Sequence, residues 1–181
     1  MGATAQPSYR EGPNCLRSSY YENLPHGWVQ TRLGDLFNLQ AGKFIPSSGI
    51  ANDNSTHKYP CYGGNGLRGY VKNYNRTGEY PLIGRQGALC GNVNYVSGKF
   101  FATEHAIVVE SFRDTNPRWA FNLLNQINLN QYSTATAQPG LSVKTINGVC
   151  IPLPPLAEQD RIVKAIDMAF EQLSIVIQIL S

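Results

Sequence analysis

The stretch Ile151-Pro-Leu-Pro-Pro-Leu-Ala-Glu-Gln-Asp-Arg-Ile-Val163 joins a proline-rich segment directly to a helical pattern. Proline fixes its own φ angle and disfavours α geometry in the residue before it, so Pro152, Pro154 and Pro155 predict an extended chain. Pro155 also suits the first position of a helix, where a missing backbone N–H costs nothing. We therefore expect a rigid, extended exit from a folded domain that leads straight into a helix over 155–181.

The expected helix carries an apolar heptad seam. Glu158 and Asp160 stand in its early turns, where carboxylates complement the positive end of the helix dipole. Apolar residues then recur at heptad spacing, and a seam of this kind needs a partner to cover it. That partner is either a second helix, parallel or antiparallel, or the chain's own domain with the helix folded back. The expected helix interface consists of Val163, Ile166, Phe170, Leu173, Ile177 and Leu180.

Several segments upstream form a pattern together with residues 151–162. They are Leu24-Pro-His-Gly-Trp28, Leu33-Gly-Asp-Leu36, Tyr59-Pro-Cys-Tyr-Gly-Gly-Asn-Gly-Leu-Arg-Gly-Tyr70 and Ile83-Gly-Arg-Gln-Gly-Ala-Leu-Cys-Gly91. In their order and spacing, these blocks resemble the specificity (S) subunit of type I DNA restriction–modification systems.

The resemblance implies an α+β fold: a compact β-rich target recognition domain with short helices, followed by a long C-terminal coiled-coil-type helix. We expect a flexible lead-in over 1–22, the recognition domain over 23–154 and a spacer or dimerisation helix over 155–181. Intact family members usually carry two such domains and two helices. This chain has one of each, so we expect a half-length or truncated subunit.

The resemblance also implies partners and a location. They are double-stranded DNA, the methyltransferase (M) and restriction (R) subunits, and either a second copy of this chain or the other half of a longer S subunit. The N-terminus lacks the apolar core of a signal peptide, and the sequence contains no run that could span a bilayer, so we expect a cytoplasmic protein.

Positive charge concentrates in one part of the chain. The net charge of the whole chain is only +3. The segment from Gln40 to Phe100 contains seven basic residues and two acidic ones, Asp53 and Glu79, so its net charge is +5. A basic segment rich in glycine and tyrosine suits attraction to phosphate, although a solvated lysine-rich surface would have the same composition. The basic residues are Lys43, Lys58, Arg68, Lys72, Arg76, Arg85 and Lys99.

The pattern of apolar residues predicts short strands joined by Gly/Asn turns, as in a β meander or mixed sheet. Leu33–Leu39 predicts a short helix or turn, and 46–57 a long loop. Asn116 should cap a helix that begins at Pro117. The polar segment after it should form an exposed loop over 138–144 that leads into a strand. The strands are expected at Lys58–Tyr62, Gly69–Tyr74, Tyr80–Ile83, Ala88–Val96, Lys99–Ala102, His105–Glu110 and Val149–Leu153.

Several of the candidate DNA contacts lie in glycine-rich turns. Arg85 and Gln86 stand between two glycines, and Arg and Gln are the side chains that pair bidentately with guanine and adenine. The alternative is a surface turn in which Arg85 pairs with Glu79 or Glu104. Turn chemistry alone could likewise explain the 62–69 glycines, Ser142 and Lys144. The full candidate set is Lys43, Tyr62, Asn65, Arg68, Lys72, Arg85, Gln86, Lys99, Ser142 and Lys144.

The sequence does not favour an enzyme. It contains no nucleotide-binding, hydrolase or metalloprotease motif, and we expect no cofactor and no metal site. The four cysteines have no CxxC spacing. Glu104 and His105 could act as acid and base, but His105 opens an apolar strand and reads better as structural. We expect a non-catalytic DNA-recognition subunit. The alternative is a protein-interaction module, or a truncated S subunit, that oligomerises through its helix without setting DNA specificity.

Overall fold

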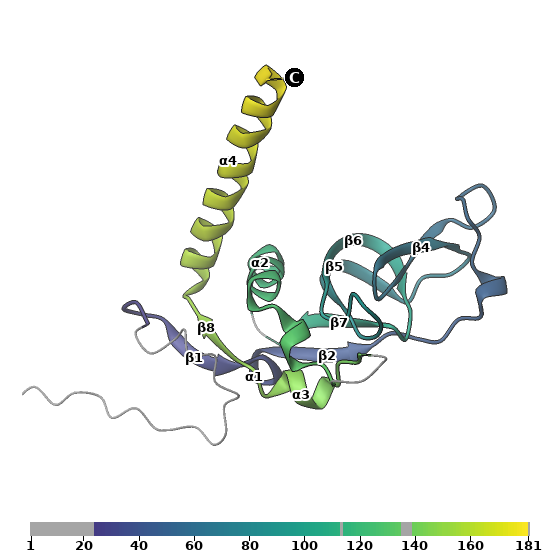
Figure 1. The fold of residues 1–181 in the computed structure, drawn as a ribbon, viewed down its shortest axis with the longest axis horizontal. Coiled ribbons are helices and arrows are strands. Elements are labelled where there is room, and N and C mark those ends of the chain that lie inside the picture. The colour runs from purple at the N-terminus through teal and green to yellow at the C-terminus, as the bar shows by residue number, and fades with distance from the viewer. Residues whose placement is uncertain (1–23, 113, 135–138, 181) are drawn as a thin grey trace, which may run out of the picture.

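The computed structural model describes residues 24–112, 114–134 and 139–180, so the lead-in expected over 1–22 lies outside the described residues. The described chain forms a six-stranded sheet, a two-stranded sheet and helices of varied length (Figure 1). In chain order the elements are β1 (Val29–Arg32), α1 (Leu33–Leu36), β2 (Phe37–Ala41), η2 (Ser47–Gly49), β3 (Tyr59–Gly63), β4 (Gly66–Val71), β5 (Arg76–Gly84), β6 (Val93–Ala102), β7 (Ala106–Ser111), α2 (Pro117–Ile127), η3 (Leu129–Tyr132), α3 (Val143–Asn147), β8 (Cys150–Leu153) and α4 (Leu156–Leu180).

The larger sheet has the strand order β2-β7-β5-β6-β3-β4. Its pairs are antiparallel except β3 with β6, which run parallel with Cys61 opposite Phe101. Side chains alternate between the two faces of a strand, so neighbouring residues enter different cores. Ile83 belongs to the main core beneath α2, whereas Leu82 belongs to a smaller core on the other face with Phe100. The central strands are therefore buried on both faces.

The smaller sheet joins the two ends of the described domain. β1 runs antiparallel to β8, with Val29 opposite Leu153 and Arg32 opposite Cys150. The next backbone hydrogen bond, from the Leu33 N–H to the Val149 carbonyl at 2.9 Å, continues this pairing into α1. The chain therefore leaves the domain beside the point where the described domain begins.

Helix α2 lies between the sheet and the start of α4. The Asn116 side chain accepts hydrogen bonds from the Arg118 and Trp119 N–H groups, and Pro117 occupies the first turn. This confirms the predicted cap. The helix ends at Ile127, and the next residue, Asn128, has a left-handed φ of 52°. Its buried residues are Trp119, Ala120, Leu124 and Ile127.

Helix α4 contains 25 residues and projects away from the domain (Figure 1). Only Gln159 and Val163 of this helix are buried. The expected class, a β-rich domain with short helices followed by a long C-terminal helix, is thus confirmed. No helix in the described part of the chain is long and apolar enough to cross a membrane.

Several strands begin or end at other residues than the sequence predicts. The two strands expected at Ala88–Val96 and Lys99–Ala102 form one continuous β6, while the residues before Val93 belong to a turn. The strand continues through Gly98 because this glycine, with φ at +87°, sits opposite Gly78, with φ at +132°, on the same rung of the sheet. Only glycine adopts such angles readily, so the rung keeps its pairing.

Two further segments fold differently from expectation. The short helix or turn predicted over Leu33–Leu39 is a helix that ends at Leu36, after which β2 pairs with β7. The loop expected over 138–144 contains the start of α3 instead. The Ser142 hydroxyl accepts a hydrogen bond from the Thr145 N–H at 3.0 Å, so Ser142 caps that helix. Residues 135–138 lie outside the described chain.

We predict that Leu124→Ala lowers the free energy of unfolding by about 2–5 kcal/mol, because it removes buried methyl groups and leaves a cavity. Leu124 is 0% exposed in the main core. Urea denaturation measures the loss. The matched control is Leu89→Ala, at a leucine that is 52% exposed, where a change within about 0.5 kcal/mol is expected. Equal losses for the two variants would contradict the described core.

Candidate nucleic-acid interface

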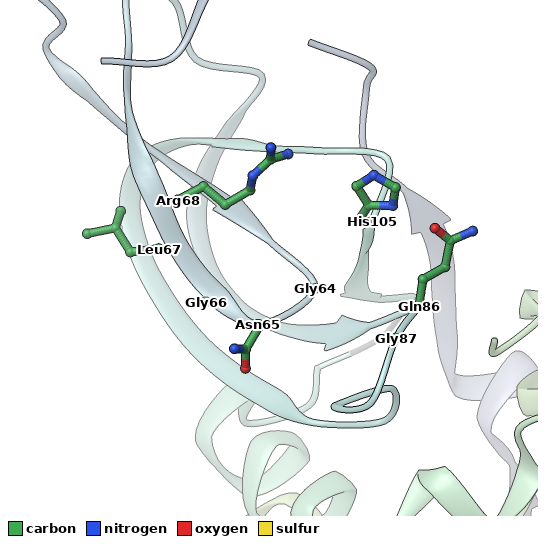
Figure 2. Close-up of a pocket in the computed structure, with 8 residues that line it drawn as sticks. All are labelled: Gly64, Asn65, Gly66, Leu67, Arg68, Gln86, Gly87 and His105. Atoms are coloured by element: carbon green, nitrogen blue, oxygen red, sulfur yellow. The ribbon is translucent and has the colours of Figure 1, made fainter. Parts of the chain in front are cut away.

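Three turns far apart in sequence meet around one concavity of about 470 Å³ (Figure 2). The β3–β4 turn and the start of β4 contribute residues 64–68, the β5–β6 turn contributes Gln86 and Gly87, and the β6–β7 turn contributes His105. Figure 2 shows the side chains of Arg68, Gln86 and His105 around this hollow. Three of the candidate contacts, Asn65, Arg68 and Gln86, are thereby brought together.

Glycines allow the turns to approach one another. A Cβ atom on Gly84 would overlap the carbonyl oxygen of Gly64, and one on Gly64 would lie 2.9 Å from the carbonyl oxygen of His105. Gly66 has a φ of +94°, which the tight β3–β4 turn requires. The glycines are therefore explained by the close backbone packing, which leaves the longer side chains of the turns exposed.

Hydrogen bonds fix the backbone of the β5–β6 turn. The Arg85 N–H donates to the His105 carbonyl at 2.9 Å, and the Arg85 carbonyl accepts from the Leu141 N–H at 2.8 Å. The Gly87 N–H donates to the Pro139 carbonyl at 3.0 Å. Gln86 is exposed next to this network and Arg85 is half-buried. A pre-set turn of this kind presents a side chain without first having to order the backbone.

The two carboxylates considered as partners of Arg85 are engaged elsewhere. Glu79 accepts a hydrogen bond from the Tyr95 hydroxyl at 2.8 Å. Burial, together with this carboxylate, raises the pKa of Tyr95 to about 12, so the phenol stays protonated. Glu104 Oε1 lies 3.1 Å from His105 Nε2. Within the described chain Arg85 has no ion-pair partner, which leaves its charge available.

His105 is a member of the concavity that the sequence did not assign to DNA contact. The Glu104 carboxylate holds one edge of its ring, and the other carboxylate oxygen, Oε2, is buried without a hydrogen-bond partner among the described residues. Only the polar triplet at 103–105 between two apolar strands marked this place in the sequence. A single polar triplet cannot indicate which turn it will face.

Lys72 and Lys99 lie away from the concavity, at the other end of the β3–β4 hairpin. Tyr59 pairs with Val71 at that end, whereas Gly63 and Gly66 pair beside the concavity. Lys99 Nζ lies 5.1 Å from the centre of the Tyr74 ring, and the Tyr59 and Tyr74 rings meet edge to face at 4.9 Å. We call Lys58, Tyr59, Tyr74 and Lys99 the tyrosine–lysine cluster. Of its members only Lys99 was a candidate from sequence.

The remaining candidates have mixed surroundings. Tyr62 is half-buried, its ring packs edge to face on Phe100 at 5.9 Å, and burial raises its pKa. It therefore supports the smaller core. Lys43 is exposed, and its N–H donates to the Ala102 carbonyl close to the 103–105 turn. Ser142 has a structural role as a helix cap, and Lys144 is exposed on α3.

The predicted helix interface divides into two parts. Val163 is 7% exposed and belongs to the domain's own main core, so the prediction that it faces a second helix is wrong: the early turns of α4 pack on the domain. Ile166 is half-buried. The outer residues are open, with exposed fractions of 66% for Phe170, 57% for Leu173, 65% for Ile177 and 81% for Leu180. The outer half of α4 does not fold back on the domain (Figure 1).

The described residues include no group of three or more His, Cys, Asp or Glu side chains that could hold a metal ion. Cys61 and Cys90 are free thiols, and both are buried. Burial raises the pKa of each thiol, so neither is a reactive thiolate at neutral pH. The chemistry that this face offers is hydrogen bonding and positive charge.

Comparison with known proteins gives a consistent result. The family described as "type I restriction modification DNA specificity domain" matches residues 25–180. The specificity subunit of the type I restriction enzyme EcoprrI from Escherichia coli is 45% identical over 150 residues, which is 82% of this chain and 37% of that subunit. The chain therefore spans little more than a third of the length of this curated relative.

Two solved structures share the fold. The S subunit of a type I restriction–modification system from M. genitalium has a TM-score of 0.70 at 17% identity, over 83% of this chain and 41% of that one. The HsdS subunit from Thermoanaerobacter tengcongensis has a TM-score of 0.67 at 21% identity, over 90% of this chain and 42% of that one. The family match over 25–180 is independent of these folds, and from it the chain belongs to the type I restriction modification DNA specificity domain family.

Proposed function

We propose that this chain is a non-catalytic DNA-recognition unit that reads one half of a bipartite target for a type I restriction–modification complex. The domain would recognise the target sequence, and the methyltransferase and restriction subunits would carry out the reactions. The single observation that carries the proposal is that Asn65, Arg68 and Gln86, far apart in sequence, all line one concavity. Amide and guanidinium groups are the side chains best suited to read base edges in the major groove.

The two basic regions of the domain would have different tasks. The turns around the concavity present side chains that can distinguish bases, with Arg85 adjacent to Gln86. The tyrosine–lysine cluster and Lys72 offer positive charge at the opposite end of the β3–β4 hairpin. Charge of this kind suits phosphate contacts, which position a protein on DNA without reading sequence. DNA that contacted both ends of the hairpin would be read at one end and positioned at the other.

The outer half of α4 would pair with another helix. Phe170, Leu173, Ile177 and Leu180 form an exposed apolar row, and Met168 and Ile179 extend the apolar surface around the helix. Apolar surface of this extent is unfavourable in water and marks an interaction site. We propose self-association through this half of α4, which would present two copies of the domain to an interrupted DNA site. The other half of a longer S subunit is the alternative partner.

A second candidate function is supported by the same helix. In this alternative the domain docks a partner protein and α4 oligomerises, so the chain assembles with M subunits without reading DNA. The two functions differ in what the domain turns do. Loss of complex assembly in variants of the turns, with DNA affinity unchanged, would favour the interaction module. Selection from a pool of random DNA duplexes, with M subunits present, tests the primary proposal: a reproducible bipartite sequence supports it.

We predict that Arg85→Ala weakens DNA binding by about 1–3 kcal/mol and relaxes base preference at one position of the selected site. The reason is the loss of a bidentate donor at a turn whose backbone stays fixed. Fluorescence anisotropy on the selected duplex measures the loss. Arg161→Ala is the control, because Arg161 bonds Glu158 of its own helix and lies on α4. An unchanged base preference in Arg85→Ala would remove this residue from the reading surface.

A different outcome is expected for Lys72→Ala. The slope of log affinity against log salt concentration should become shallower by about one, because one fewer phosphate is neutralised, while base preference stays the same. Titrations at several salt concentrations measure the slope. Lys164→Ala makes the same charge change on α4 and should leave the slope unaltered. If both lysine variants behave alike, the hairpin end has no phosphate contact.

Self-association predicts that the chain sediments as a dimer at tens of micromolar and that Phe170→Asp or Leu173→Asp converts it to a monomer. A carboxylate in a buried apolar interface is strongly unfavourable, which is the reason for the expected dissociation. Gln172→Asp places the same charge on the same part of the helix, outside the heptad row, and should have the smaller effect. A wild-type monomer that is indifferent to all three changes would overturn the claim.

A further inference from the structure

A small set of polar side chains joins α4 to the domain, and we call Asn116, Gln159 and Asp160 the polar clamp. Gln159 is only 2% exposed and uses both ends of its amide. Its Oε1 accepts from the Asn116 N–H at 3.0 Å, and its Nε2 donates to the Pro154 carbonyl at 3.0 Å. The Asn116 Nδ2 donates to Asp160 Oδ1 at 2.8 Å.

Asn116 connects the clamp to the sheet side of the domain. The same side chain that donates to Asp160 also accepts the two N–H groups that begin α2. Residues of α2 lie in the main core, so the position of Asn116 is fixed by packing. The buried amide of Gln159 is fixed in turn, because turning it away would leave the part-buried Asn116 N–H and the buried Pro154 carbonyl unpaired. These bonds therefore define the direction in which α4 leaves the domain.

The other polar link between α2 and α4 is weaker. Arg118 lies 3.6 Å from Asp167, but both side chains are 53% exposed. An exposed ion pair of this kind is screened by water and salt and holds its geometry poorly. Of the polar links described, the clamp is the one protected from solvent.

The angle at this joint has a large effect at the far end of the helix. With about 1.5 Å of rise per residue, the 25 residues of α4 extend about 37 Å. A rotation of about 10° at the clamp would therefore move the far end by about 6 Å, close to two base-pair steps of about 3.4 Å. If the angle between α4 and the domain varied, the distance between two domains that pair through α4 would vary as well.

We propose that Asn116, Gln159 and Asp160 are positioning residues that set the half-site spacing of the DNA target by fixing the angle between α4 and the recognition domain. This inference rests on the proposed function. Beyond that function, the spacing between half-sites would depend on these three residues as well as on the length of α4. None of the three lies at the concavity, so they should affect spacing without affecting which bases are read.

Asn116→Asp tests the clamp while sparing the fold. Aspartate caps a helix as well as asparagine does, so α2 keeps its first turn. The donor to Asp160 is lost, and two carboxylates face each other instead. Combining Asn116→Asp with Asp160→Asn restores one hydrogen bond with donor and acceptor exchanged. Arg161→Ala is the matched control, because it removes hydrogen bonds one residue further along the helix that stay within α4.

The first measurement needs no DNA. Spin labels are attached to keto-bearing residues introduced at Ser97 and Gln172, both exposed, and the labelled full chain is diluted with excess unlabelled chain so that only distances within one chain are observed. We expect a narrow distance distribution for the wild type and the Arg161→Ala control. It should broaden in Asn116→Asp and narrow again in the exchanged double variant. A distribution unchanged by Asn116→Asp, in a chain that melts as the wild type does, would overturn the inference.

The second measurement is selection from random duplexes with M subunits present. For Asn116→Asp we expect the same half-site bases as the wild type but a spread of spacer lengths, returning to one length in the double variant. A single unchanged spacer length, or altered half-site bases, would overturn the positioning role. Failure of the wild-type chain to select any sequence would instead contradict the proposed function, and the distance measurement would stand on its own.

Discussion

The antiparallel pairing of β1 with β8 is the constraint on which the rest of the structure depends. It brings the first described strand and the last strand of the domain together, with Val29 opposite Leu153. The prolines that follow β8 cannot bend freely, so the chain passes from this pair into α4 within a few residues. The start of the helix is therefore tied to the closure of the domain, and the polar clamp then determines its direction.

The proposed reading surface depends on a different feature, the two-sided burial of the central strands. Because β5, β6 and β7 are covered on both faces, their connecting turns are anchored at each end. The backbones of Gly64 and Gly84 approach each other closely, which brings these turns together. The backbone hydrogen bonds of Arg85 then hold the turns in place. The result is a rigid concavity that carries polar side chains. Rigid presentation lowers the ordering cost of binding.

Local signals predicted the elements that depend on local chemistry. Asn116 with Pro117 marked the start of α2, and the prolines before Leu156 marked the start of α4, because caps and proline act within one turn. Continuity of β6 was not predictable, since Gly98 remains in the strand only through its pairing with Gly78 on a neighbouring strand. The sequence predicts Ser142 in a loop, whereas it caps α3, because the cap exists only once the chain turns into that helix.

The candidate site was predictable only in part, because local sequence signals show the turns but not which turns meet in the fold. Asn65, Arg68 and Gln86 lie in glycine-rich turns that are visible in the sequence, whereas His105 joins them only through the tertiary fold. Heptad spacing placed Val163 and Phe170 at the same position of the helix, yet one is in the domain core and the other is open. The spacing specifies a face of the helix but not how far the domain extends along it. Gln159, one heptad before Ile166, is buried at the joint with the domain.

The central claim is that the concavity formed by the β3–β4, β5–β6 and β6–β7 turns faces DNA. Amide hydrogen exchange of the full chain, measured with and without a duplex recovered by selection, tests this most directly. We expect slower exchange in residues 64–68, 85–87 and 103–105 when DNA is bound, with little change in α2. Protection confined to α4, or no protection in the three turns at saturating DNA, would contradict it.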